Sequence, residues 1–424
     1  MKKLSKRIWA SFIIIGIVGQ FAWTIENMYF NVFLYNTIST DPTYIANMVA
    51  ASAIAATLTT LLMGALSDKV GKRKAFIVVG YILWGLSTAS FGFISVENVS
   101  AWFPAANAVA TAAGLVVVMD CVMTFFGSTA NDAAFNAYVT DNTAEDNRGR
   151  VESVLATLPL ISMLVIFGGF DALTQQGRWS EFFLIFGIAV TITGIASIFL
   201  LKDKPIEKKD EPYFKNIIYG FKPSVIKANG LLYIAFMAVL VFSVAVQIFF
   251  PYLIIYMQKY LGFDGYAIIL GIVLIVASAV SVLSGGFIDK TGKLRVIFPA
   301  AAIMLAGLLG MFFVRSFVGV IVAGSVMMSG YMLVTAILSA IVRDHTPKDK
   351  VGLFQGIRMI FQVLLPMVIG PYIGAAVIKN SGATYEELGV IKSVPTPNIF
   401  LAAAIALVVV VVPVVFLKKG SKRQ

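Results

Sequence analysis

The chain has 424 residues, of which 59% are hydrophobic and only 13% are charged. A soluble globular protein carries about 25% charged residues, so this composition excludes an ordinary soluble domain and favours a lipid solvent. The formal net charge of +11 does not indicate a nucleic-acid-binding protein, because the positive residues lie in short loops between apolar segments.

Twelve segments are apolar and long enough to cross a bilayer as helices, which takes about 20 residues. The first one has no small-residue cleavage site, so we interpret it as a span and not as a signal peptide. The sequence therefore predicts an all-α membrane protein with two six-helix halves, residues 1–201 and 229–424, joined by a polar linker over 202–228. The spans lie near 8–36, 43–67, 75–96, 110–140, 150–173, 180–201, 229–258, 265–288, 294–315, 317–342, 352–378 and 397–417.

Lys and Arg are concentrated on one side of these spans. One set of loops contains both terminal basic clusters, the linker lysines and the basic run at 69–74. The opposite loops contain few basic residues, which are Arg178, Lys259, Arg315, Lys379 and Lys392. By the positive-inside rule, we expect a multi-pass protein of the cell membrane with both termini in the cytoplasm.

Two loops carry the same motif. Residues 64–74 read GALSDKVGKRK, and residues 285–295, which follow 221 positions later, read GGFIDKTGKLR. A second echo links VTDNT at 139–143 with VRDHT at 342–346. Two such echoes in corresponding loops predict duplicated halves related by a pseudo-two-fold axis.

Both loops resemble the signature between helices two and three of major facilitator transporters. The resemblance implies that fold, and it assigns Asp68, Arg73, Asp289 and Arg295 to loops that control the conformational cycle. Glycine there allows close approach of helices, and an aspartate can cap a neighbouring helix end.

A narrower resemblance, carried by residues 131–150, 343–358 and the end of the first span, is to the glycoside-pentoside-hexuronide cation symporters, the melibiose permease relatives. In that family an aspartate on helix four lies at the sugar site, and Asp132 matches its position. The family's acidic pair on helix two is replaced here by Ala56 and Thr60, and the acidic residue expected in helix one falls near Gln20 or Phe21. This departure argues against a sodium site of that kind and does not exclude a sugar.

Ionisable residues within spans cost about 2.5–3.5 kcal/mol on insertion scales, so each is a functional candidate. Glu26 lies beside Asn27, which shares a helix face with Asn31, and the 221-residue repeat maps Glu26 onto Gln247. A carboxylate that is costly to keep charged suits a proton carrier. The alternative is a structural hydrogen bond between helices.

Asp132 is nine residues before Asp141, which places it about 13 Å inward, near the midplane. Ser128, Asp132 and Asn136 form one polar face that can bind sugar hydroxyls, with Trp23 or Tyr256 against the apolar side of the sugar. Asp132 is also a second candidate for proton coupling. The alternative role for Asp132 is a polar clamp between helices.

Two further groups have open roles. Asp120 lies about 18 Å from Asp132 along the same helix, so we expect it near the outer surface. Gln355, Arg358 and Gln362 share one face of the eleventh span, where Gln362 is a substrate candidate. Arg358 is either a gate residue or a side chain that reaches the membrane surface.

The lone cysteine, Cys121, and the lone histidine, His345, exclude an intrachain disulfide and a Ser-His-Asp triad. We expect no metal, no cofactor and no enzymatic activity. The sequence predicts a monomeric secondary active transporter that carries a sugar or glycoside by symport with a proton rather than sodium. The alternatives are a proton-coupled exporter of drugs or other metabolites, an integral membrane enzyme, and a receptor without transport.

Overall fold

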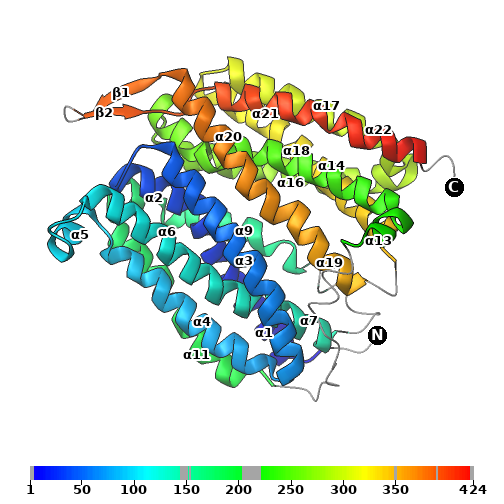
Figure 1. Ribbon diagram of the computed structural model, residues 1–424, viewed down its shortest axis with the longest axis horizontal. Helices are drawn as coiled ribbons and strands as arrows, with labels where there is room; N and C mark the ends of the chain where they lie inside the picture. Colours follow the sequence, from blue (N-terminus) through cyan, green and yellow to red (C-terminus); the bar gives the residue numbers. More distant parts are fainter. Residues whose placement is uncertain are drawn as a thin grey trace. The chain divides into compact units, whose positions relative to one another are not determined.

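The computed structural model describes residues 4–143, 151, 154–202, 221–347, 351–387 and 390–420, and these residues are nearly all helical (Figure 1). In this described part, eleven helices are long and apolar enough to cross a membrane. The fifth predicted span appears as the shorter apolar helix α9 (Leu158–Gly169), which follows a turn at residues 156–157 and ends before a turn at Phe170. The predicted all-α membrane fold is confirmed.

The chain divides into two compact units, of which the N-terminal unit comprises residues 1–40 and 47–211. Its helices are α1 (Lys6–Thr24), η1 (Ile25–Tyr29), α2 (Phe30–Thr37), α3 (Pro42–Val70), α4 (Arg73–Ser90), η2 (Phe91–Phe93), α5 (Val96–Trp102), α6 (Ala108–Gly127), η3 (Ser128–Phe135), α7 (Asn136–Asn142), α9, α10 (Asp171–Gln175) and α11 (Trp179–Leu200).

The C-terminal unit comprises residues 212–424 together with 41–46, the start of α3. Its elements are α13 (Pro223–Ala228), α14 (Gly230–Phe249), η4 (Phe250–Tyr252), α15 (Leu253–Ile255), η5 (Tyr256–Tyr260), α16 (Tyr266–Thr291), α17 (Lys293–Phe313), α18 (Phe317–His345), α19 (Val351–Met359), η7 (Ile360–Leu364), α20 (Leu365–Ser381), the antiparallel hairpin β1 (Thr384–Glu387) and β2 (Val390–Ser393), α21 (Asn398–Val409) and α22 (Val411–Gly420). Most of the predicted linker, residues 203–220, lies outside the described part.

Glycine permits the tightest helix crossings in each unit. A Cβ on Gly85 of α4 would lie 2.5 Å from the carbonyl oxygen of Gly187 on α11, and a Cβ on Gly330 of α18 would lie 2.3 Å from the backbone nitrogen of Met304 on α17. Small residues are the usual means of packing helices closely in lipid, where association gains little from the hydrophobic effect. In both units, glycine therefore allows two helices to pack closely.

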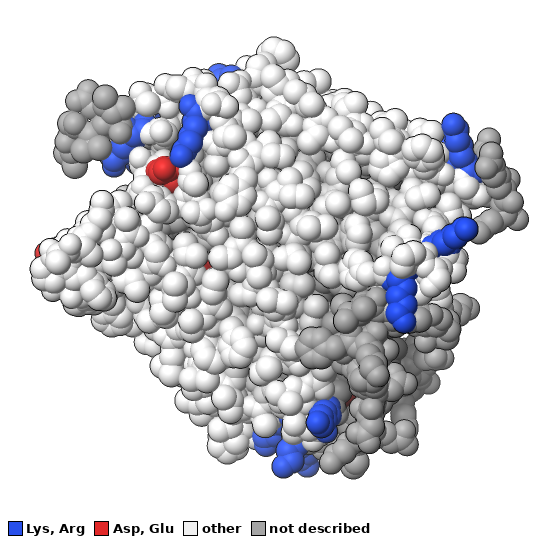
Figure 2. Space-filling model, in the orientation of Figure 1, with Lys and Arg blue, Asp and Glu red and all other residues white. Residues whose placement is uncertain are grey.

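The surface of the helices is apolar. Large hydrophobic side chains are widely exposed, with Leu283 at 82% and Phe199 at 75%. In the face drawn in Figure 2, uncharged side chains cover the helices and the Lys and Arg side chains lie toward the edges. Such a surface is stable only against lipid, so the chain is a multi-pass membrane protein.

Within the described ranges, four helices change from α to π geometry, at η1, η3, η5 and η7. Each π-helical segment contains a residue that the sequence singled out: Glu26 in η1, Asp132 in η3, Tyr256 in η5 and Gln362 in η7. A π-helical turn widens the helix and redirects the side chains around it, and such turns are frequent at functional sites.

Candidate functional site

Glu26 is buried at a junction of three helices. Its Oε1 accepts hydrogen bonds from Ser52 Oγ of α3 at 2.6 Å and from Thr124 Oγ1 of α6 at 2.9 Å. The oxygen atoms of the two hydroxyls lie 3.1 Å apart. The other carboxylate oxygen, Oε2, is buried with no hydrogen-bond partner. The hydrogen bonds between helices that were the alternative role for Glu26 are therefore present at Oε1, and Oε2 accepts none.

Asp120 is buried against neighbouring helices. It is 1% exposed, lies one turn before Thr124 on α6, and is within electrostatic reach of Glu26 and Ser52. Its Oδ1 has no hydrogen-bond partner. This burial was not predicted from the sequence, because position along one helix does not reveal which neighbours cover a residue.

Asp132 is half-buried in η3, where Ser128 Oγ donates to its Oδ2 at 3.1 Å. Its charge reaches Glu26. Asn136 is exposed one turn later, and its side-chain amide donates to the backbone oxygen of Asp132 at 3.1 Å. The structure therefore places Ser128, Asp132 and Asn136 on one polar face, with part of the Asp132 carboxylate open to a ligand.

Asn131, rather than Asp132, forms the polar clamp between helices. Its Nδ2 donates to the Tyr81 hydroxyl of α4 at 2.7 Å, and that hydroxyl donates to the Ile15 carbonyl of α1 at 2.8 Å. The indole of Trp23 donates to Asn131 Oδ1 at 3.4 Å and packs against Trp84 with ring centroids 5.0 Å apart. This clamp positions Trp23 and leaves Asp132 outside the structural network.

The two asparagines of the first span have different surroundings. Asn27 is exposed and donates to the Trp23 carbonyl at 2.8 Å, whereas Asn31 is buried and donates to the Asn27 carbonyl at 3.0 Å. Both amides are therefore partly engaged by their own helix. Asn27 has the more accessible side chain of the two.

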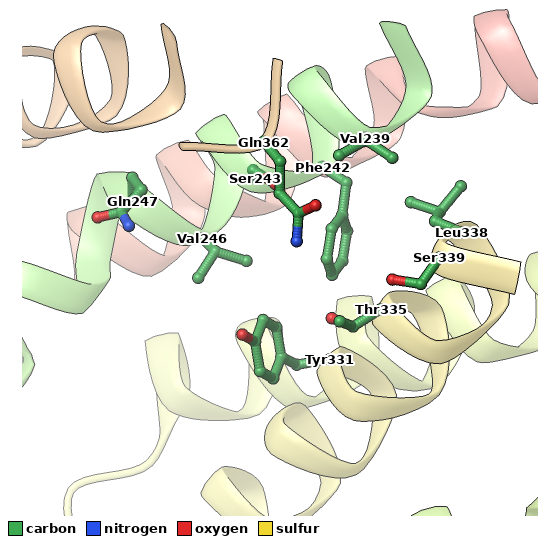
Figure 3. Close-up of a pocket in the computed structure, with 10 residues that line it drawn as sticks. All are labelled: Val239, Phe242, Ser243, Val246, Gln247, Tyr331, Thr335, Leu338, Ser339 and Gln362. Atoms are coloured by element: carbon green, nitrogen blue, oxygen red, sulfur yellow. The ribbon is translucent and has the colours of Figure 1, made fainter. Parts of the chain in front are cut away.

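The C-terminal unit contains a cavity of about 120 Å³ (Figure 3). Residues of α14 lie on one side and residues of α18 on the other, and Gln362 of η7 points between them. The rings of Phe242 and Tyr331 stack with centroids 5.9 Å apart and planes 15° apart. The lining residues are Val239, Phe242, Ser243, Val246, Gln247, Tyr331, Thr335, Leu338, Ser339 and Gln362.

The sequence repeat relates this cavity to the polar face of the N-terminal unit. The first echo maps Glu26 onto Gln247, and the spacing of the second echo maps Ser128, Asp132 and Asn136 onto the cavity residues Tyr331, Thr335 and Ser339. These last three residues were not predicted from the sequence. The second echo would have identified them, had it been extended backward along the helix.

Arg358 connects two of the cavity residues. The half-buried guanidinium donates through Nε to Gln362 Oε1 at 2.7 Å and through Nη2 to Ser339 Oγ at 3.2 Å. Tyr256 is not among the lining residues, and it is fully buried against Tyr260 and Phe400. The side chain of Gln355 lies outside the described part.

In each unit, a basic residue of the signature loop pairs with the aspartate of the second echo. Arg73 Nε lies 3.2 Å from Asp141 Oδ2, and Lys293 Nζ lies 2.6 Å from Asp344 Oδ2. Gly71 and Gly292, with φ of 69° and 94°, follow the C-terminal ends of α3 and α16 in backbone conformations that L side chains rarely adopt. Arg295 is exposed, and the side chains of Asp68 and Asp289 lie outside the described part.

Comparisons with known proteins agree on the architecture. The family model described as Major Facilitator Superfamily matches residues 12–371. A mutant of the nucleoside transporter NupG is similar in structure, with a TM-score of 0.74 and 12% identity over 96% of this chain and 98% of that one. No curated protein matches the chain by sequence.

Two further solved structures are similar. The xylose transporter XylE from E. coli has a TM-score of 0.67 and 13% identity over 98% of this chain and 99% of that one. A bacterial homologue of the human lysosomal transporter Spinster has a TM-score of 0.68 and 12% identity over 98% and 96%. Identities this low show a shared fold alone.

Proposed function

This chain belongs to the major facilitator superfamily, and we propose that it is a proton-coupled symporter that carries a sugar or glycoside by alternating access. Members of this family transport small molecules across membranes. The proposal adds a substrate class, a coupling ion and a direction of coupling. It also places the chain in the cell membrane as a monomer with both termini in the cytoplasm.

The cavity of the C-terminal unit carries the substrate proposal. Its polar lining consists of hydroxyls and amides, namely Ser243, Gln247, Tyr331, Thr335, Ser339 and Gln362, and no charged side chain is among the described residues that line it. Neutral hydroxyls and amides both donate and accept hydrogen bonds, as the hydroxyls of a sugar require. The stacked Phe242 and Tyr331 offer an aromatic surface to the apolar side of a sugar ring.

The N-terminal unit supports coupling to a proton. Glu26 and Asp132 are acidic groups within predicted spans, and no Lys or Arg among the described residues forms an ion pair with either. Ala56 and Thr60 stand where the melibiose permease relatives have acidic residues of a sodium site, so we expect no sodium dependence. The narrower resemblance to that family remains a prediction from sequence, like the sugar itself.

Uptake into proteoliposomes tests the proposal. A panel of labelled mono- and disaccharides is supplied with a proton gradient, with a sodium gradient or with neither, and a protonophore serves as the control. We expect at least one sugar to accumulate only when the proton gradient is present. Strong stimulation by sodium would refute the proton as coupling ion. Transport of large apolar cations without any sugar would favour the exporter.

A further inference from the structure

Glu26 and Asp120 are two buried carboxyl groups that share one hydroxyl neighbour. Glu26 is 7% exposed and Asp120 is 1% exposed. Ser52 donates to Glu26 at 2.6 Å and also lies within reach of Asp120. Thr124, which donates to Glu26, is one turn from Asp120 on the same helix face. We propose that Glu26 and Asp120 form a single proton-binding pair that holds one proton between them, an inference that rests on the proposed proton coupling.

The unpartnered oxygen atoms of both groups support this assignment. Glu26 Oε2 and Asp120 Oδ1 are buried and accept no hydrogen bond. A buried carboxylate oxygen without a donor is costly, and two like charges buried close together are costlier still. No Lys or Arg in the described ranges pairs with either group. One bound proton reduces the charge of the pair from two to one and removes the repulsion.

A third buried carboxylate shows what a purely structural acid looks like in this protein. Asp171 of α10 is 2% exposed and accepts from the Tyr29 hydroxyl at 2.8 Å, from Thr174 Oγ1 at 3.3 Å and from Gln175 Nε2 at 2.5 Å. Both of its oxygens have donors, so its negative charge is stabilised by its surroundings. Glu26 and Asp120 lack that complement of donors.

Among the described residues, the other titratable groups that interact with the pair are Asp132 on η3, whose charge reaches Glu26, and Cys121, next to Asp120 on α6. Two buried tyrosines on neighbouring segments are Tyr29 on η1 and Tyr81 on α4. Tyr29 and Tyr81 are engaged with Asp171 and with Asn131 and Ile15, respectively. Asp132 is half-buried and lies on the polar face with Ser128 and Asn136. A substrate bound to Asp132 can therefore affect the pair through the Asp132 charge.

Proton binding at the pair is a simple acid–base step. One proton from water forms an O–H bond on either Glu26 or Asp120, and the other group remains a carboxylate. Release breaks that bond and returns the proton to water, which leaves the pair with two negative charges. Ser52 can donate to whichever group is ionised, because its hydroxyl hydrogen rotates freely.

An infrared-monitored pH titration of the purified full-length protein tests the pair without requiring transport. The protonated carboxyl band is followed in the parent, Asp120→Asn, Glu26→Gln and the matched control Asp171→Asn. Removing one member removes its repulsion, so the remaining member should bind its proton only at a pH lower by about one unit or more. The control should titrate like the parent. An unchanged midpoint in Asp120→Asn would overturn the proposal.

A second variant covers the case in which Asp120→Asn does not fold. Asp120→Glu keeps the carboxyl group and moves it by one methylene, so the band of the shared proton should shift in frequency and persist; an unchanged band also contradicts the pair. The pH profile of uptake, measured separately, should follow the infrared midpoints. A parent that shows the pair by infrared and no proton-dependent uptake would refute the proposed function alone.

Discussion

The polar face of the N-terminal unit and the cavity of the C-terminal unit occupy equivalent positions in the sequence repeat, yet their chemistry differs. The acidic groups of the N-terminal unit are Glu26, Asp120 and Asp132, and hydroxyl groups donate hydrogen bonds to Glu26 and Asp132. The neutral cavity has Gln247 in place of Glu26 and Thr335 in place of Asp132. Duplication of the scaffold has preserved where the polar groups lie and has changed their charge.

Because of this difference, the two regions should respond differently to pH. Acidic groups in a protein interior respond to protons, whereas neutral amides and hydroxyls bind a polar ligand in the same way at every pH. Proton binding and pH-dependent binding of sugar hydroxyls are then properties of the N-terminal unit, and pH-independent recognition of hydroxyl groups is a property of the C-terminal unit. The first two of the following predictions test that contrast, and the other two compare ion pairs away from these regions.

The largest effect is expected at Glu26. Glu26→Gln removes the titratable group and matches the amide that the repeat places at Gln247, so uphill accumulation should be lost and equilibrative exchange should remain. Gln247→Asn, the matched change in the neutral cavity, should retain accumulation at saturating substrate. The measurement is uptake and counterflow in proteoliposomes. Accumulation by Glu26→Gln would break the contrast between the units.

Substrate binding should weaken more at Asp132 than at Thr335. A hydrogen bond to a charged group contributes about 1.5–3 kcal/mol and a neutral one about 0.5–1.5 kcal/mol. We therefore expect Asp132→Asn to weaken sugar binding about ten- to a hundredfold and Thr335→Val about two- to tenfold. Calorimetry on folded protein gives both constants. Parent-like affinity in Asp132→Asn would identify that residue as structural.

Of the two ion pairs at the signature loops, the more buried one should contribute more to the stability of the protein. The Arg73 side chain is 7% exposed and also donates to Ser67 Oγ at 2.5 Å, whereas Lys293 is 28% exposed and its partner Asp344 is 51% exposed. Arg73→Gln should cost about 1–3 kcal/mol of stability, and Lys293→Gln less than about 1 kcal/mol. Thermal unfolding in detergent compares them. Equal losses would show that burial does not decide the difference.

The smallest effect is expected at an ion pair outside both polar regions. Burial raises the pKa of Asp41, but hydrogen bonds from Thr43 and Lys379 outweigh it and hold that pKa below its ordinary value. The Lys379 Nζ lies 3.0 Å from Asp41 Oδ1, and both side chains are more than 40% exposed.

Because the folded-state pKa is depressed, this contribution is present above about pH 4, the ordinary pKa of an aspartate, and is lost as the pH falls through the lower folded value. Lys379→Met should cost less than about 1 kcal/mol at neutral pH and less still at pH 3, with transport unchanged. Unfolding curves at the two pH values provide the check. A loss of transport would extend the functional region beyond the two polar regions.

Several features of the site could be predicted from the sequence. Glu26 and Asp132 were identifiable because a charged residue within an apolar run is costly wherever the helix packs. The repeat predicted that Gln247 is the counterpart of Glu26. The role predicted for the loop glycines, close approach of helices, does not apply to Gly71 and Gly292, where an added Cβ would meet nothing within 4 Å. Both residues instead adopt positive φ after the ends of two helices.

Other features required the packed structure. The sequence left a clamp between helices as the alternative role for Asp132, whereas Asn131 forms that clamp, and the burial of Asp120 beside Glu26 could not be read from its own helix. Both features depend on which faces of α1, α3, α4 and α6 meet.

The spans, the halves and their repeat are therefore determined by the sequence itself, because hydropathy and spacing are local properties of the chain. The chemistry of the site was decided by tertiary structure. Ser52 and Thr124 are 26 and 98 residues from Glu26, and nothing in the apolar pattern of their spans indicates that their hydroxyls meet its carboxylate. Packing between distant helices alone brings these groups together, and it also leaves two carboxylate oxygens without donors.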